Sequence, residues 1–207
     1  MVTLKHEGSN IEVKNSILQA AQKRFGLYGF EKTSMHEIAL DIGMSKGSIY
    51  YYYTDKEELY KAVVRIEQDE FLNALNDKVI QTDDPEKMLF EYVEMRLIYF
   101  RKLLNLGRFR LEEFAGMKSF LSDSATHFRT KELAFIQKIF KIGIEKKVFF
   151  IDDKEFIAGL FLDVLKGLRI ILMSKKDIFY IDQKEFETMI NNSHRFTQVF
   201  LNGLKYR

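Results

Sequence analysis

Apolar residues recur about every 3.6 positions along almost the whole of this 207-residue chain. Within residues 10–28, for example, Ile17, Ala21 and Phe25 lie four positions apart. That spacing places side chains on one face of an α-helix. No segment shows the strict alternation of apolar and polar residues that is typical of a half-buried strand. The pattern therefore predicts an all-α protein.

Capping residues divide this pattern into about nine expected helices. A serine or aspartate followed three positions later by a glutamate predicts a capping box, and this spacing occurs at Ser34, Asp152 and Asp182. Asp84 followed by Pro85 is a further typical helix start. The expected helices span residues 10–28, 34–42, 45–52, 54–77, 85–103, 107–117, 122–145, 152–173 and 182–204, with an extended connector at 146–151.

Residues 34–53 match the template of a helix-turn-helix motif. The first helix needs a small residue where the second helix crosses it closely, and Ala39 lies at that position. Four residues later the turn needs a backbone that tolerates positive φ, which Gly43 provides. The second helix, residues 46–52, would then enter the major groove of DNA. The apolar positions that the buried side of this pair requires are Ile38, Ile42, Met44, Ile49 and Tyr52.

Residues 17–64 resemble the N-terminal DNA-binding domain of TetR-family transcriptional regulators. One departure is Tyr52-Tyr53, where the family often has His-Phe. The segment IGIEKKVFFIDDKEF also resembles the family's junction before its last two helices. The matching positions in the domain are Ala20-Ala21, Phe25, Gly29-Phe30, Thr33, Ile38-Ala39, Gly43, Ser45-Lys46-Gly47-Ser48-Ile49-Tyr50-Tyr51, Tyr53 and Lys56-Glu57-Glu58-Leu59.

The resemblance implies an Ω-shaped homodimer built from two kinds of domain. Residues 1–55 would form a three-helix DNA-binding head, and residues 56–207 a larger helical body for ligand binding and dimerisation. The last two helices of each subunit would form a four-helix interface. The implied function is repression of genes from a palindromic operator, relieved by a small molecule. The implied partners are double-stranded operator DNA, a small-molecule effector and a second copy, in the cytoplasm.

Nine residues in the head or directly after it are candidates for DNA contacts. Lys46 and Lys56 are cations beside the second helix of the motif and can pair with phosphates. Gly47 permits close approach to the groove, where a side chain would collide. Backbone N–H groups near Thr33 and Ser34 begin a helix and favour a phosphate. The full set is Thr33, Ser34, Ser45, Lys46, Gly47, Ser48, Tyr50, Tyr51 and Lys56.

Three of these candidates also have a purely structural interpretation. Ser45 is a suitable N-cap for the second helix of the motif, and Ser34 is a suitable N-cap for the first. Tyr50 could pack between the head helices instead of bonding to a phosphate. The sequence leaves both interpretations open for each residue.

Charge gives no support to DNA binding. The chain carries a net charge of +2, and residues 1–60 hold seven Lys or Arg against eight Asp or Glu. The fold must therefore separate these charges if the head binds phosphates. Composition excludes other classes more firmly: the absence of cysteine excludes disulfides and thiolate sites. No apolar run is long enough for a membrane span or a signal peptide.

The body is rich in aromatic residues, which favours a largely apolar or aromatic effector. Asp163 and Lys166 lie three positions apart on an otherwise apolar helix. They could form an ion pair at the dimer interface, or they could anchor the polar part of a ligand. Candidate ligand contacts are Tyr92, Met95, Arg96, Tyr99, Phe109, His127, Phe128 and Phe161. Candidate dimer contacts are Phe161, Leu165, Leu168, Phe186, Ile190, Phe196 and Phe200.

No motif indicates an enzyme, a metal site or a cofactor. The Glu-x-x-His repeats of di-iron helical proteins are absent from the sequence. None of the four histidines has a metal-binding spacing, and neither a Gly-rich phosphate loop nor a Gly-x-Ser-x-Gly elbow occurs. One remaining alternative is a DNA-binding protein that needs no ligand and is controlled by protein partners. The sequence also leaves open whether the protein represses or activates transcription.

Overall fold

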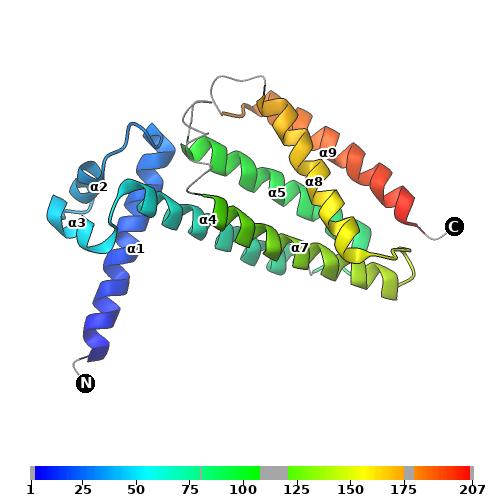
Figure 1. The fold of residues 1–207 in the computed structure, drawn as a ribbon, viewed down its shortest axis with the longest axis horizontal. Helices are drawn as coiled ribbons and strands as arrows, with labels where there is room; N and C mark the ends of the chain where they lie inside the picture. Colours follow the sequence, from blue (N-terminus) through cyan, green and yellow to red (C-terminus); the bar gives the residue numbers. More distant parts are fainter. Residues whose placement is uncertain (1–2, 80, 108–120, 175–179, 206–207) are drawn as a thin grey trace.

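The computed structural model describes residues 3–79, 81–107, 121–174 and 180–205, and every regular element in these ranges is an α-helix (Figure 1). The all-α prediction is confirmed. The helix expected at 107–117 falls almost entirely outside the described residues. The helices are α1 (Thr3–Tyr28), α2 (Met35–Asp41), α3 (Lys46–Tyr52), α4 (Lys56–Val79), α5 (Pro85–Gly107), α7 (Ser122–Glu145), α8 (Lys154–Met173) and α9 (Gln183–Leu204).

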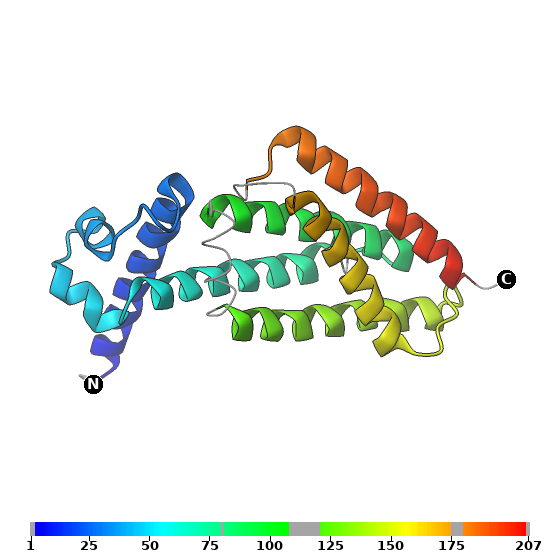
Figure 2. The same cartoon turned by 45° about the horizontal axis from the view of Figure 1, so that its top comes forward.

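The helices form a small group at one end of the molecule and a larger group at the other (Figures 1 and 2). The small group holds α1, α2 and α3. In the larger group, α5 packs against α4, α7 and α9, while α8 crosses the bundle and packs on α7 and α9. Helix α4 runs from one group into the other. None of the helices in the described ranges is both long and apolar enough to cross a bilayer.

Two of the three predicted capping boxes occur, at Ser34 and Asp182. The third prediction is wrong by one residue. Helix α8 begins at Lys154, so Asp153 and not Asp152 is the N-cap, and its carboxylate accepts from the N–H groups of Glu155 and Phe156. Helix α1 begins at Thr3, earlier than the expected residue 10. Residues 3–9 contain only one apolar side chain, so the apolar pattern did not predict this extension.

Helix α4 contributes to the cores of both groups. Near its start, the ring of Tyr60 packs edge-on against Phe25 and Phe30, each 5.1 Å away between centroids. Further along, the ring of Phe71 stacks on that of Tyr99 at 4.9 Å. Both aromatic clusters are buried. Helix α4 therefore links the two groups, in addition to the direct packing of α1 on α5.

The connector between α7 and α8 is fixed by a close approach at Gly143. The N–H groups of Val148 and Phe149 both donate to the Gly143 carbonyl, at 2.8 and 3.1 Å. The turn includes Lys147 with φ of 57°. Phe150 then donates its N–H to the carbonyl of Leu204 at 2.7 Å, which ties the connector to the end of α9. The predicted extended connector is therefore a turn followed by a short extended segment.

Replacing Gly143 by alanine is expected to lower the free energy of unfolding by about 1–3 kcal/mol. A Cβ atom at Gly143 would lie 2.0 Å from Cδ2 of the buried Phe149 ring, so the ring must move. Alanine's better helix propensity offsets only about 1 kcal/mol of this. Urea denaturation measures the change. Gly203→Ala on α9, where a Cβ meets nothing within 4 Å, is the control and should not be destabilised. Equal stability of the two variants would contradict the packing at Gly143.

Candidate DNA interface

The turn between α2 and α3 has the geometry expected of a helix-turn-helix. Ala39 is fully buried, and its carbonyl accepts the N–H of Met44 at 2.8 Å. Gly43 has φ of +67°, the left-handed conformation that glycine adopts without strain. Ile38 and Ile49 are fully buried on the inner side of the pair. The opposite side of α3 is therefore free to face a partner.

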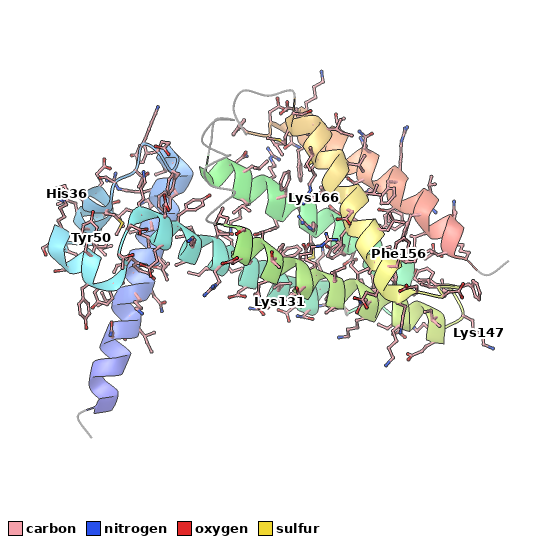
Figure 3. The ribbon with its side chains drawn as sticks, in the orientation of Figure 1. His36, Tyr50, Lys131, Lys147, Phe156 and Lys166 are labelled. Carbon is pink, nitrogen blue, oxygen red and sulfur yellow. The ribbon has the colours of Figure 1, made fainter. Side chains whose placement is uncertain are left out.

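The outer face of α3 brings together most of the predicted DNA contacts. Lys46, Gly47 and Ser48 are exposed. Tyr50 is 41% exposed and Tyr51 79% exposed. Figure 3 shows Tyr50 at the end of the molecule away from the larger helical group. The structure thus favours a surface role for Tyr50 over packing between the head helices.

Ser45 has the structural role that its position predicted. Its Oγ accepts the N–H of Ser48 at 3.1 Å and lies 2.8 Å from the Ser48 hydroxyl. Ser45 is therefore the N-cap of α3. Both hydroxyls remain exposed at the start of the helix.

The predicted phosphate contacts at Thr33 and Ser34 are not available as expected. Thr33 is buried, and its hydroxyl donates to the Gly29 carbonyl at 2.8 Å. Ser34 donates both its N–H and its hydroxyl to the carboxylate of Glu37, at 2.9 and 2.7 Å. The hydrogen bonds from Ser34 also lower the pKa of Glu37, which keeps this carboxylate charged. A negative charge at the start of α2 opposes a phosphate there.

Lys56 has a structural contact that was not predicted, and its phosphate contact stays a prediction. Its Nζ donates to the carbonyl of Phe30 at 2.9 Å and lies 4.3 Å from the centre of the Phe30 ring. Lys56 is half-buried, and these two contacts join the start of α4 to the segment between α1 and α2. An ammonium group has three donors, so a phosphate contact would be additional to this structural role.

Internal bonds engage many of the acidic side chains near the head. Arg24 on α1 pairs with Asp41 at 2.5 Å and with Glu37 at 3.3 Å, and its hydrogen bond lowers the pKa of Asp41. Glu58 accepts from the N–H and hydroxyl of Thr54. Helix α3 itself has the sequence KGSIYYY, with one lysine and no acid. The excess of acid in the first 60 residues therefore does not lie on the exposed face of α3.

Two of the predicted ligand contacts, Tyr92 and Arg96, converge on a residue that sequence reasoning missed. Glu132 on α7 is 2% exposed. It accepts a hydrogen bond from the Tyr92 hydroxyl at 2.7 Å and forms an ion pair with Arg96. Its position was the available signal, because Glu132 lies four residues after Phe128 and four before Ile136 on the apolar stripe of α7. A charged residue on a buried stripe needs a partner inside the protein.

The other predicted ligand contacts lie in different surroundings. The rings of Tyr99 and Phe128 are buried 5.2 Å apart, and Met95 is partly buried nearby on α5. His127 is exposed and lines a surface cavity of about 310 Å³ between α4 and α7. Phe161 is buried against α9, and Phe109 lies outside the described residues. Only part of the predicted set is therefore grouped together.

The predicted dimer contacts require a correction. Phe161 and Leu165 are buried within their own subunit, so a partner cannot reach them. The Phe161 ring packs on Phe196 and Phe200 of the same chain, at 5.6 and 4.8 Å. Helical periodicity identified an apolar face but could not say which neighbour covers it. Leu168, Phe186 and Ile190 are partly buried.

The polar pair expected on α8 does not form. Asp163 binds Arg129 on α7 at 2.9 Å, and both side chains are substantially exposed. Asp163 is therefore neither paired with Lys166 nor placed in the interior. Figure 3 shows Lys166 and Phe156 on the same helix.

Comparisons with known proteins agree with this geometry. Residues 17–63 match the model for bacterial regulatory proteins of the tetR family. A crystal structure of a transcriptional regulator from Cytophaga hutchinsonii is 32% identical, covering 95% of this chain and 99% of that one, with a TM-score of 0.83. A TetR-family regulator from Pectobacterium atrosepticum shares the fold at 16% identity, covering 97% of each chain, with a TM-score of 0.76.

Among curated proteins, the regulator QacR of Staphylococcus aureus is 22% identical over 196 residues, which cover 94% of this chain and 99% of QacR. The family match lies on the helix-turn-helix and its supporting helices, while the full-length similarities extend over the body. The chain belongs to the TetR family of transcriptional regulators.

Proposed function

We propose that this protein is a homodimeric repressor that binds a palindromic operator through α3 and is released by a small molecule bound in the body. The observation that carries this proposal is the exposed outer face of α3, where Lys46, Gly47, Ser48, Tyr50 and Tyr51 lie together without an acidic residue. Residues 1–55 would be the DNA-binding head, and residues 56–207 the body for ligand binding and dimerisation.

The second subunit is proposed to cover the outer face of α8. This helix exposes large apolar side chains that no element in the described ranges covers. Several large apolar side chains exposed on one helix are typical of a protein–protein interface. A symmetric dimer would bury it on both subunits at once. The exposed residues are Phe156, Leu160, Ile170 and Ile171.

A buried polar contact is proposed to carry the signal from the body to the head. Glu67 on α4 accepts a hydrogen bond from Gln22 on α1 and pairs with Lys102 on α5 at 2.5 Å. Glu67 is 2% exposed, so both partners are needed to compensate its burial. An effector that shifts α5 would thereby displace α1 and the head.

The experiment that tests DNA recognition is Gly47→Leu. An added Cβ at Gly47 meets only the Ser45 hydroxyl, at 3.9 Å, so the free protein has room for a side chain. If α3 enters the groove, leucine must collide with DNA. We expect the melting temperature to stay within a few degrees and the affinity for a selected operator duplex to fall at least about tenfold. Fluorescence anisotropy measures the affinity.

The matched control is Gly203→Leu, which adds the same side chain at another helical glycine with open space, on α9 in the body. Its operator affinity should equal that of the unaltered protein. If Gly47→Leu and Gly203→Leu bound the operator with equal affinity, α3 would not be part of the DNA interface.

A further inference from the structure

Three charged side chains from three helices lie close together inside the body. Arg96 comes from α5, Glu132 from α7 and Arg169 from α8. All three side chains are largely withdrawn from water, and Arg169 is only 7% exposed. Two guanidinium groups face one carboxylate, which leaves an excess of one positive charge.

Glu132 bonds directly to Arg96, whereas Arg169 receives only the through-space attraction of the same carboxylate. Its carboxylate is engaged by Arg96 and by the Tyr92 hydroxyl. Burial opposes the charge of Arg96, but Glu132 outweighs it and raises the pKa of Arg96. Burial, followed by repulsion from Arg96, lowers the pKa of Arg169 to about 9. Arg169 therefore remains charged at neutral pH without an equivalent partner.

No acceptor for Arg169 occurs among the residues that the structure describes. Its guanidinium lies 4.3 Å from the centre of the Phe100 ring, a contact with a π-face and not with an anion. The one other buried carboxylate in the described ranges, Glu67, is engaged by Gln22 and Lys102. Asp163 on the same helix turns outward to Arg129.

A buried cation without an anionic partner destabilises a protein unless something supplies the missing charge. A guanidinium is suited to bind a carboxylate through two parallel hydrogen bonds. Its surroundings combine polar and apolar side chains. Arg96, Glu132, Tyr92 and Tyr99 lie close enough to act on its charge. Phe100 contacts it, and the buried Leu165 and Met173 lie one turn away on α8. The apolar neighbours suit a ligand that is apolar next to its charged group.

We propose that Arg169 binds the carboxylate of the effector, which is a monoanionic amphiphile with an aliphatic or aromatic body. This inference rests on the proposed function, and it adds to it the charge of the effector and the residue that selects it. One negative charge neutralises the excess left by Arg96, Glu132 and Arg169. A doubly charged phosphate ester would leave an unpaired negative charge in the same interior.

The first test is the stability of the full-length protein without ligand. If Arg169 is the binding site of an anion, Arg169→Met removes an uncompensated charge from the unliganded protein. The melting temperature of the variant should then equal or exceed that of the unaltered protein. Arg129→Met removes a surface cation from the adjacent helix α7 and is the control. A clear drop in melting temperature for Arg169→Met alone would show that Arg169 is a structural residue, and would overturn the inference.

The second test is binding of defined carboxylates by calorimetry. The probes are the even-numbered alkanoates from octanoate to hexadecanoate and 3-phenylpropanoate, each compared with its alcohol of the same carbon skeleton. We expect at least one carboxylate to bind more tightly than its alcohol. Arg169→Met should weaken that carboxylate about 10- to 100-fold and leave the alcohol unchanged. Arg169→Lys should retain part of the preference, and Arg129→Met all of it.

Failure of this inference is distinguishable from failure of the proposed function. Operator binding by the unaltered protein, measured without ligand, tests the function alone. If operator is bound and no probe carboxylate binds in preference to its alcohol, the charge assignment is wrong and DNA binding stands. If a carboxylate binds through Arg169 and no duplex is selected, the anion site stands and the regulatory function fails.

Discussion

Glu132→Leu is expected to lower the free energy of unfolding by about 3–5 kcal/mol, the largest effect on stability predicted for this protein. The substitution removes the carboxylate that compensates Arg96 and leaves two buried guanidinium groups, Arg96 and Arg169, facing each other. It also removes the acceptor of the Tyr92 hydroxyl, which is fully buried. Urea denaturation at neutral pH measures the loss.

A second substitution separates the charge from the loss of packing. The double variant Arg96→Met/Glu132→Leu replaces the ion pair by apolar side chains, and we expect it to recover at least half of the lost stability. The control is Asp163→Asn, which breaks the exposed pair with Arg129 and should cost less than about 1 kcal/mol. If Glu132→Leu were as mild as Asp163→Asn, the interior ion pair would have no role in stability.

Ile171→Glu is expected to give the largest effect on assembly. Ile171 is 62% exposed in the single chain, so a glutamate there should leave the subunit folded. In the proposed dimer the same carboxylate would be buried against apolar side chains, at a cost of several kcal/mol. We expect monomers by sedimentation velocity. Operator affinity should fall by at least about 100-fold, because two linked heads bind far more tightly than one.

Ile98→Glu is the matched control, since Ile98 is also an exposed isoleucine but lies on α5. It should remain dimeric with unchanged operator affinity. Dimers that persist in Ile171→Glu at micromolar concentration would place the interface elsewhere. Phe200→Asp is unsuitable for this test, because the Phe200 ring packs between Phe140 and Phe161 and its loss would disturb the subunit.

Several helix boundaries and the turn of the motif were predictable because they depend on local chemistry. The capping box of Ser34 with Glu37 and the left-handed turn at Gly43 involve residues close in sequence. A short segment is therefore enough to predict both. The same holds for the exposed face of α3, where burial of Ile49 leaves the neighbouring positions outside.

Contacts between distant segments were not predictable in this way. Lys56 was predicted to contact a phosphate, but its contact with Phe30, 26 residues earlier, was not predicted, because it joins the start of α4 to the segment between α1 and α2. Phe161 was expected at a dimer interface, and α9 of its own chain covers it. Apolar periodicity shows that a face is buried but does not identify the covering element. Glu132 was detectable only as a charge on a buried stripe, and its partners Tyr92 and Arg96 are 40 and 36 residues away.

If a bound effector tilts α4, the length of this unbroken helix determines how far the head moves. A helix of 24 residues is about 36 Å long, and it joins both aromatic clusters without a break. Tilting such a rod by about 5° at its body end displaces the other end by about 3 Å. In a symmetric dimer the two heads move in opposite directions, so their separation changes by about 6 Å. Half-sites one helical turn of DNA apart are spaced by about 34 Å, so in the proposed dimer a tilt of this size would put both copies of α3 out of register with the DNA.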